Sequence, residues 1–323
     1  MDYTTLGRTG LRVSVAGLGC GGFSRLGQSA GKSEDESVAI VRLAIEHGVT
    51  LVDTAANYGT EAIVGKALRG VPRDGVVVAT KSSIASEGQT WPVERITASL
   101  DNSLRVLGVD CIDVFQLHGV QPSLYDHALN VVAPALLRER ERGKFRFLGI
   151  TETSPADPSH AMLARACEDG VWDVVMVAHH LLHRTAAETV FPLAQRHRIG
   201  TLLMFAVRSI FARPAQLREV VRQLAAEGRV DGAFADEPDP LGFLVHPGGA
   251  ESLTDAAYRF ARHEPGVDVV LFGTGDADHL RANIASLLRP PLPQADLARL
   301  REVFARVSGV GLDRPPPSRS RAA

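Results

Sequence analysis

The chain of 323 residues lacks the features that mark several classes of protein. No stretch approaches the roughly 18 apolar residues that a membrane-spanning helix needs. The first residues, MDYTTLGRTGLRVSVAG, hold no apolar run of signal-peptide length. The three cysteines, Cys20, Cys111 and Cys167, form no CxxC pair, which is typical of free thiols in a reducing compartment. We therefore expect a cytoplasmic protein that does not span a membrane.

An excess of charge of one sign is also missing. The formal net charge is −2, 22% of the residues are charged, and basic residues are mixed with acidic ones instead of forming a stripe. This pattern argues against a nucleic-acid partner. What the chain does have is an apolar content of 45%, enough for one large core of the kind that α/β barrels bury.

Eight short apolar runs alternate with helical patterns along the chain. Most of these runs are continuous, as expected for parallel strands that are buried on both faces. Eight strand–helix units predict an α/β fold, a single (β/α)8 TIM barrel. The candidate strands are Val15–Gly19, Thr50–Asp53, Val76–Lys81, Ile112–Leu117, Phe147–Ile150, Val174–Val177, Thr201–Phe205 and Val269–Phe272.

Helix signals lie between these runs. Ser33 and Glu36 predict a capping box at a helix start, and apolar residues recur at helical spacing from Pro92 to Gly108. Further helices, including an extra one at the C-terminal end, are expected at residues 136–142, Leu163–Glu168, Val190–His197, Leu217–Glu227, Leu253–Arg262 and Leu297–Val307.

Three segments do not belong to a bare barrel. Tyr3–Thr5 and Arg12–Ser14 predict an N-terminal β-hairpin. The polar, Pro/Gly-rich segment Arg229–Gly249 predicts a loop over one mouth of the barrel. We expect the barrel to span residues 1–312 and the tail 313–323, DRPPPSRSRAA, to be disordered.

Ionisable side chains follow consecutive strands. Asp53 ends the second strand and Tyr58 follows in its loop, while Lys81 ends the third strand and His118 the fourth. Each alone has an ordinary explanation, such as a helix cap or a solvated rim residue. In a TIM barrel, however, the C-terminal strand ends meet at the active site, so these four side chains predict a catalytic group.

The four residue types match what carbonyl reduction needs. A free tyrosine, with a pKa of about 10, gives up its proton reluctantly at neutral pH. A neighbouring ammonium lowers that pKa, and a buried carboxylate keeps the ammonium charged and oriented. An imidazole opposite the phenol can hydrogen-bond the carbonyl oxygen, and the hydride comes from a cofactor.

DTAANYG followed by EAIVGKAL resembles the signature of the aldo-keto reductase family around its catalytic aspartate and tyrosine. The lysine after the third strand and Leu-His-Gly after the fourth complete that family's tetrad in order. The resemblance runs from the Leu-Gly-Arg-Thr-Gly turn to the region of Asn283. It implies that Tyr58 is the general acid–base, Lys81 tunes it, Asp53 pairs with Lys81, and His118 orients the carbonyl.

The resemblance also implies a nicotinamide cofactor, NADP(H) more than NAD(H). Gly21 and Gly22, after the first strand, would pass near the nicotinamide ribose, beside Asp53. The segment VDVVLFGTGDADHLRANIASL resembles the family's eighth strand and phosphate loop, where backbone amides of 273–276 could take a phosphate. The residues expected around the adenosine end are Gly273, Thr274, His279 and Asn283.

Several positions depart from the family pattern. Gly273 and His279 stand where a lysine and an arginine commonly grip the 2′-phosphate, so the choice between NADP(H) and NAD(H) stays open. Thr151-Glu152 replaces the Ser-Asn that commonly holds the carboxamide, and Met176 replaces a glutamine. We hypothesise that Glu152 accepts a hydrogen bond from the carboxamide and that its charge favours the oxidised ring, with a bias toward dehydrogenation or weakened NADPH binding as the result.

Two residues after the seventh strand complete the expected cofactor contacts. Phe205 is a candidate to stack on the nicotinamide, with plain rim packing as its alternative. Arg208 is expected to approach the pyrophosphate, with a solvated side chain as its alternative.

The leading interpretation is an oxidoreductase that acts on a small carbonyl or alcohol. A dehydratase or lyase on the same barrel, a nicotinamide-binding regulatory subunit and, last, a metal-dependent hydrolase remain as alternatives. Of His179, His180 and His183, we expect one or two to line the substrate pocket, and no metal-ligand set accompanies them. No exposed apolar stripe in the helix patterns specifies an oligomeric state.

Overall fold

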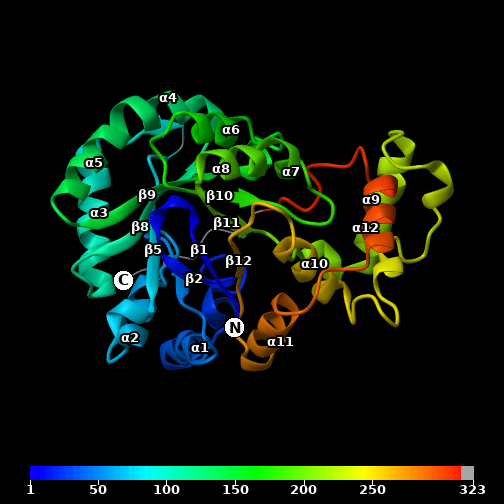
Figure 1. Ribbon diagram of the computed structural model, residues 1–323, viewed down its shortest axis with the longest axis horizontal. Helices are drawn as coiled ribbons and strands as arrows, with labels where there is room; N and C mark the ends of the chain where they lie inside the picture. The colour runs from blue at the N-terminus through cyan, green and yellow to red at the C-terminus, as the bar shows by residue number, and fades with distance from the viewer. Residues whose placement is uncertain (87, 314–323) are drawn as a thin grey trace.

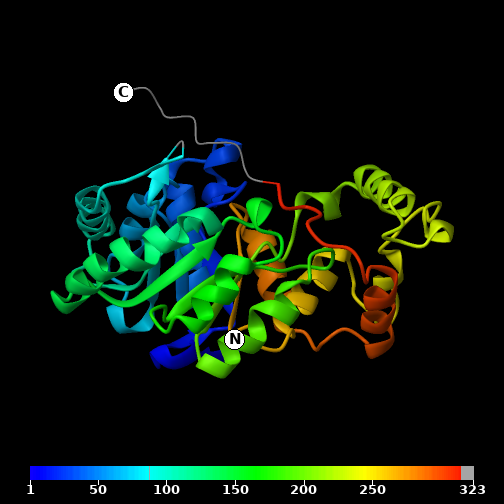
Figure 2. The ribbon, with the colours of Figure 1, turned by 90° about the horizontal axis from the view of Figure 1, so that it is seen from above.

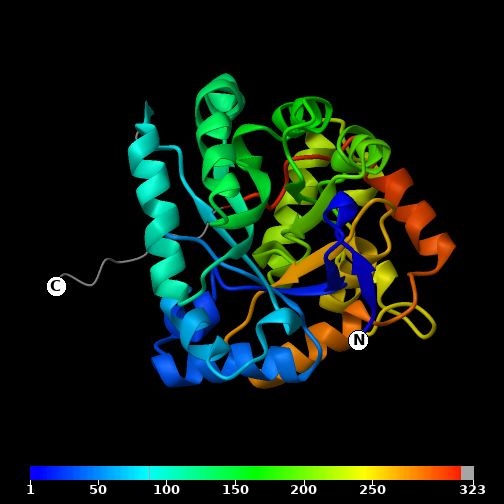
Figure 3. The ribbon, with the colours of Figure 1, turned by 60° about the vertical axis from the view of Figure 1, so that its left-hand side comes forward.

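The structure, a computed structural model, describes residues 1–86 and 88–313. Eight parallel strands close into a barrel in the order β10, β11, β12, β3, β4, β5, β8, β9, as the sequence predicted (Figure 1, Figure 3). Their bounds are β3 (Ala16–Gly19), β4 (Leu51–Asp53), β5 (Val77–Ser82), β8 (Ile112–Val120), β9 (Phe145–Glu152), β10 (Val174–Ala178), β11 (Gly200–Met204) and β12 (Val269–Phe272).

The alternation of side chains along each strand decides which residues reach the inside of the barrel. Apolar residues of the inner core occupy every second position, such as Leu51 in β4 and Val77 and Ala79 in β5. The next residues in the same alternation are Asp53 in β4 and Lys81 in β5. The strand period therefore turns both ionisable side chains inward at the C-terminal end of the barrel.

The predicted N-terminal hairpin is present and closes the opposite mouth. Strands β1 (Tyr3–Thr5) and β2 (Arg12–Ser14) pair antiparallel. Leu6 and Leu11, in the turn between them, are buried in the inner core. Gly7, with φ of 47°, packs so closely on the start of β11 that a Cβ atom there would lie 2.2 Å from a backbone nitrogen.

Local signals set the ends of the outer helices. In α1 (Glu34–Glu46) the predicted capping box forms, because Ser33 Oγ accepts from the Glu36 amide and the Glu36 carboxylate accepts from the Ser33 amide. Helix α3 (Val93–Leu107) ends, as predicted, at Gly108 with φ of 67°. The other helices are α2 (Glu61–Leu68), α4 (Tyr125–His127), α5 (Ala133–Glu141), α6 (Ala161–Glu168), α7 (Ala186–Thr189), α8 (Phe191–His197), α9 (Pro214–Ala226), α10 (Leu253–Arg262), α11 (Ala277–Leu287) and α12 (Gln294–Val303).

Helix α2 lies directly on the end of α3 because Gly65 has no side chain. A Cβ atom on Gly65 would lie 2.7 Å from the carbonyl oxygens of both Val106 and Leu107. The glycine of the EAIVGKAL motif is therefore required for the packing of α2 against α3.

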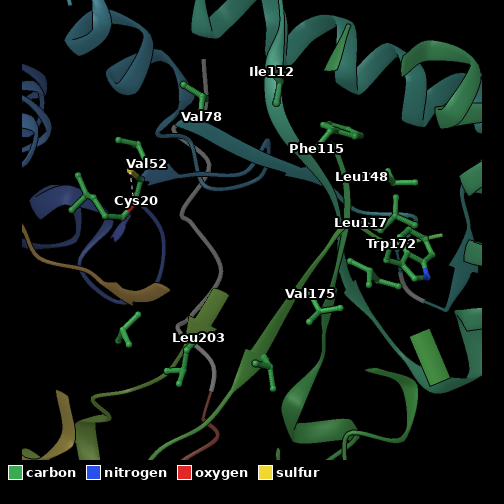
Figure 4. Close-up of a cluster of buried hydrophobic side chains, with 14 of the residues drawn as sticks. Cys20, Val52, Val78, Ile112, Phe115, Leu117, Leu148, Trp172, Val175 and Leu203 are labelled. Atoms are coloured by element: carbon green, nitrogen blue, oxygen red, sulfur yellow. Dashed lines mark hydrogen bonds between the residues drawn. The ribbon is translucent and has the colours of Figure 1, made fainter. Parts of the chain in front are cut away.

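The main core lies between the strands and the surrounding helices, and Figure 4 shows part of it. Residues that alternate with the inner set, such as Val52, Val78 and Phe115, face the helices and are fully buried. This layer fixes the strands whose other face carries the ionisable residues.

A second core lies beside the barrel, in a region that we call the lateral lobe (residues 209–250 and 290–313). It contains α9 and α12, which stand next to each other away from the strands in Figure 1. The segment Arg229–Gly249 belongs to this lobe, where Val230, Leu241 and Leu244 are buried. The predicted loop over the barrel mouth was therefore wrong: apolar residues within the segment hold it against α9 and α12.

Two further observations concern the ends and the surface. Of the predicted disordered tail, residues 314–323 lie outside the described part of the chain, and Asp313 is bound to Arg208. None of the described helices is long and apolar enough to cross a membrane.

Candidate active site

Lys81 and Asp53 form a buried ion pair at the ends of β5 and β4. Lys81 Nζ donates to Asp53 Oδ2 at 2.6 Å and to the carbonyl of Thr54 at 2.9 Å, and the Lys81 side chain is 0% exposed. The second aspartate oxygen, Oδ1, accepts from Gln116 Nε2 at 3.3 Å. The sequence reasoning missed Gln116, although a polar residue two positions before His118 in an apolar strand lies on the same inward face.

Tyr58 lies in the loop after β4, with its ring close to the ammonium. Lys81 Nζ is 5.0 Å from the ring centroid, and Tyr58 Oη is 3.4 Å from His118 Nε2. On Gly21, a Cβ atom would lie 2.3 Å from the Tyr58 ring. Gly21, predicted as a cofactor contact, therefore also provides the space that the phenol occupies.

Two threonines of the fifth barrel strand and its loop hold the backbone next to His118. The amide of Gly119 donates to Thr151 Oγ1 at 2.7 Å, and Thr153 Oγ1 donates to the Gly119 carbonyl at 2.5 Å. Gly119 has φ of 64°, and the pairing of β8 with β9 is irregular at this point. Thr151 thus fixes the turn that presents the histidine.

Burial and charge act in opposite directions on the pKa values of this group. Burial raises the pKa of the Tyr58 hydroxyl above its usual value, and the charge of Lys81 partly opposes this. Burial lowers the pKa of the Lys81 ammonium, but Asp53 and Tyr58 raise it by more, so that it lies above its usual value. Burial likewise raises the pKa of Asp53 against the charge of Lys81. At neutral pH the phenol therefore carries its proton and the lysine its charge.

These side chains face a cavity of about 1100 Å³ at the C-terminal mouth of the barrel. Asp53, Tyr58 and His118 line it, whereas Lys81 is buried behind them. All the residues predicted to contact a cofactor also line it: Gly21, Gly22, Asp53, Thr151, Glu152, Phe205, Arg208, Gly273, Thr274, His279 and Asn283. The structure therefore brings the predicted set together around one space.

Glu152 does not have the role that we hypothesised for its carboxylate. The side chain is 0% exposed; Oε2 lies 2.7 Å from His160 Nδ1, and Oε1 accepts from the Ala178 amide at 2.8 Å. Because Thr151 continues the inward alternation of β9, the next side chain turns outward. The hypothesis of a carboxylate directed at the carboxamide was therefore wrong.

His160 is the partner of Glu152 that the sequence reasoning missed. It stands before α6 with φ of 58°, a strained conformation for a residue with a side chain. A histidine eight residues from its partner carries no periodic signal, so only the folded loop reveals the pair.

The loop predicted to take a phosphate already uses some of its amides. The amide of Asp276 donates to Thr274 Oγ1 at 3.0 Å. The Asp276 carboxylate accepts from the amides of Asp278 and His279, both at 2.9 Å, and so caps α11. The side chain of His279 is 78% exposed. Phosphate binding through all of the predicted amides would require these bonds to open.

The histidine cluster lies behind the cavity. His179, His180 and His183 are each 0% exposed, and none of them lines the cavity. The expectation that one or two would do so was wrong, because their rings pack among buried groups: His179 stacks on Phe260, and His180 meets Phe211 edge to face. Within residues 1–86 and 88–313, no group of three or more His, Cys, Asp or Glu side chains is arranged to hold a metal ion.

The cavity suits a nicotinamide dinucleotide in size and in chemistry. Glycines form part of its wall, and a Cβ atom on Gly22 would meet nothing within 4 Å, so a flat group can approach the backbone there. Arg25 and Arg208 bring positive charge. Ser24 Oγ is buried without a hydrogen-bond partner in the described part of the chain, which is typical of a group that receives a ligand.

Comparisons with known proteins agree with this arrangement. The model of the Aldo/keto reductase family matches residues 17–305. L-galactose dehydrogenase from Arabidopsis thaliana is 27% identical over 94% of both chains, and an aldo-keto reductase from Bacillus subtilis is 26% identical over 87% of both. An aldo-keto reductase from Bacillus halodurans, in its holo form, has a TM-score of 0.71 at 22% identity, covering 95% of this chain and 97% of that one. One from Klebsiella pneumoniae, solved with NADP and acetate, has a TM-score of 0.67 at 24% identity, covering 99% of both chains.

Proposed function

The chain belongs to the aldo/keto reductase family, whose members are in general NAD(P)H-dependent oxidoreductases, and we propose that Tyr58 moves the proton in its reaction. The reaction is hydride transfer between a nicotinamide cofactor and a small carbonyl or alcohol. The single observation that carries this proposal is the contact series from Asp53 through Lys81 to the ring of Tyr58, whose hydroxyl faces His118 at the cavity.

Each side chain has a distinct task in the proposed mechanism. The protonated Tyr58 hydroxyl donates to the oxygen of a carbonyl substrate, and in the reverse direction it accepts the proton of an alcohol. Lys81, held charged by Asp53, stabilises the phenolate that forms when the proton leaves. His118 hydrogen-bonds the same substrate oxygen and fixes its position opposite the phenol.

The cofactor supplies the hydride when it is bound. Thr151, Phe205, Arg208 and the loops at Gly21–Gly22 and 273–279 would hold it, since all of them line the cavity. We propose NADP(H), with NAD(H) as the alternative; NADP in the related Klebsiella pneumoniae structure supports the first, whereas Gly273 supplies no cation for a 2′-phosphate.

The lining near Tyr58 favours a polar, uncharged substrate. Hydroxyl and amide side chains enclose this end of the cavity, and a short pairing of β6 (Ala85–Ser86) with β7 (Gln89–Thr90) forms one rim. The relative named L-galactose dehydrogenase supports a hydroxylated aldehyde or alcohol. The uncharged polar residues that line the cavity from these loops are Asn57, Ser83, Ser86, Gln121, Ser123, Thr153 and Ser154.

The test pairs cofactor binding with turnover. Titration with NADPH and NADH, followed by fluorescence, measures binding, and a panel of aldehydes and sugars measures turnover. Tyr58→Phe removes only the hydroxyl, so we expect turnover to fall by about 10²- to 10⁴-fold with the cofactor dissociation constant unchanged. Tyr3→Phe, which removes a hydroxyl at the protein surface, is the matched control.

Other outcomes would favour the other interpretations. Full turnover by Tyr58→Phe would refute the assigned mechanism. Binding without turnover on any substrate would favour a regulatory subunit. Conversion without a change in cofactor absorbance would favour a dehydratase or lyase.

A further inference from the structure

Arg208 is a buried cation in the wall of the cavity. It follows β11, and its side chain is 5% exposed. Nε donates to the Gly311 carbonyl at 2.5 Å, and Nη2 donates to the Asp313 carbonyl and lies 3.3 Å from the Asp313 carboxylate. The group expected to meet a cofactor phosphate is therefore bound to the C-terminal segment of the same chain.

Two aromatic rings enclose this guanidinium. Its carbon lies 3.9 Å from the centroid of the Phe205 ring and 5.7 Å from that of Phe23, and both rings line the cavity. Phe205 has φ of 71°, a conformation that costs energy for a bulky residue and that is typical of functional sites. The cation is thus held in a fixed place at the cavity wall.

The segment that binds Arg208 comes from the lateral lobe. In Figure 2 the chain returns from α12 toward the barrel as the red segment. The amide of Gly309 donates to His183 Nδ1 at 3.1 Å, Leu312 is buried, and Ser209 Oγ donates to the Asp313 carboxylate at 3.3 Å. We call residues 309–313 the C-terminal strap.

The side-chain carboxylate of Asp313, in the C-terminal strap, lies beside a guanidinium that could also bind a phosphate. A guanidinium presents donors whose geometry fits carboxylates and phosphates equally. Burial of Arg208 requires a compensating anion, and Asp313 provides it. The Asp313 carboxylate is thus the counter-ion of Arg208, and a phosphate that approached the guanidinium would compete with it for that place.

The surroundings of Arg208 belong to the side of the cavity where the phosphates are expected. Strand β11 is adjacent to β12, which leads into the loop at Gly273. Phe23 is followed by Ser24, whose Oγ has no hydrogen-bond partner among the described residues and would lie 3.6 Å from a Cβ atom on Gly273. Arg208, Ser24 and this loop thus line the same cavity.

We propose that the Asp313 carboxylate, as the counter-ion of Arg208, takes the place of a phosphate of the dinucleotide until the cofactor displaces it. This inference rests on the proposed function. The C-terminal strap is accordingly an internal competitor that weakens cofactor binding.

Removal of the competing charge tests the inference. In Asp313→Asn the backbone carbonyl still accepts from Arg208, so the strap stays docked while the carboxylate is lost. We expect the dissociation constant of NADPH to fall by roughly 3- to 10-fold, which corresponds to about 0.7–1.4 kcal/mol. Asp236→Asn, on the exposed surface of the lateral lobe, makes the same change in net charge and should leave this constant unchanged.

A second substitution tests whether the effect of Asp313→Asn depends on Arg208. Arg208→Gln should weaken binding, and Asp313→Asn added to it should have no further effect. If the pyrophosphate is the ligand, NADH and NADPH respond alike; if the 2′-phosphate is the ligand, only NADPH responds. Circular dichroism melts of each variant establish that the fold is retained.

Three results would overturn the inference. These are equal affinities in Asp313→Asn and the native protein, weaker binding in Asp313→Asn, and an effect of Asp313→Asn that persists in Arg208→Gln. Absence of cofactor binding by the native protein would overturn the proposed function as well, which separates the two failures.

Discussion

The two halves of the cavity differ in what their polar groups contact. On the side of β4, β5 and β8, the ionisable side chains contact one another: Lys81 is bound to Asp53 and faces Tyr58. On the side of β9, β11 and β12, polar groups are held by partners outside the cavity, as Glu152 is by His160 and Arg208 by Asp313. The half to which we assign proton transfer is thus organised in advance, whereas in the half to which we assign the cofactor, polar groups would have to exchange partners. We call them the proton-transfer half and the cofactor half.

The largest expected effect comes from breaking the organised half. Lys81→Met leaves Asp53 as a buried, uncompensated carboxylate, and we expect a loss of about 3–5 kcal/mol in the free energy of unfolding, together with loss of turnover. Chemical denaturation measures the first and the substrate panel the second.

The control is a lysine in an exposed ion pair. Lys66 pairs with Glu34 on the surface, and both side chains are about half exposed. Lys66→Met should cost less than about 1 kcal/mol. Equal losses in the two variants would mean that the Lys81 pair is solvated and not organised as described.

We expect an intermediate effect when the pH is lowered, because three buried histidines lie behind the cofactor half of the cavity. The quantity that changes is the free energy of unfolding. Burial lowers the pKa of His179 and of His180, and it lowers the pKa of His183 to about 3. Above pH 6.5 these histidines are neutral in both the folded and unfolded states, so their stabilising effect is complete. As the pH falls from 6.5 toward 3, the unfolded chain takes up the proton of His183 first, and stability falls by about 1.4 kcal/mol per pH unit for this residue. Protonation of His179 and His180 in the unfolded chain acts in the same direction.

Urea denaturation between pH 8 and pH 5 measures this slope. Glu264, which lies 3.7 Å from His179, is the acidic group that opposes the effect at that residue. His180→Phe removes one of the three titrating rings, so the unfolding free energy should fall less steeply with decreasing pH. A stability that does not change below pH 6.5 would contradict the burial of these rings.

The smallest effect concerns Glu152 and sharpens the contrast between the halves. Glu152→Asn is too short to reach both His160 and the Ala178 amide, so we expect a loss of about 1–3 kcal/mol in stability. Because the carboxylate is buried and already bound to His160 and to the Ala178 amide, the ratio of affinities for oxidised and reduced cofactor should not change. Glu152→Gln, which keeps the length of the side chain, is the matched control. A changed affinity ratio would restore the hypothesis of a charge beside the nicotinamide.

Features with a local or periodic cause were predictable from the sequence. The capping box at Ser33, the helix end at Gly108 and the eight strands all follow from neighbouring residues. The convergence of Asp53, Lys81 and His118 follows from strand alternation in a barrel. The roles proposed for these residues stay predictions.

Features that depend on contacts between distant segments were not predictable. The Arg208–Asp313 pair joins residues 105 positions apart through the path of the lateral lobe. The position of Arg229–Gly249 likewise depends on how α9 and α12 pack. For Glu152, the signal was present, because the alternation that turns Thr151 inward turns its neighbour outward.

Gly65 has a consequence for experiments that randomise the signature region. A library covering residues 53–68 should yield two distinct kinds of defective clone. Replacements of Tyr58, which is outside the buried ion pair, would give folded but inactive protein. Replacements of Gly65, where any side chain meets the backbone at the end of α3, would instead give poorly expressed protein. The same stretch of sequence thus records two independent selection pressures, one on chemistry and one on yield.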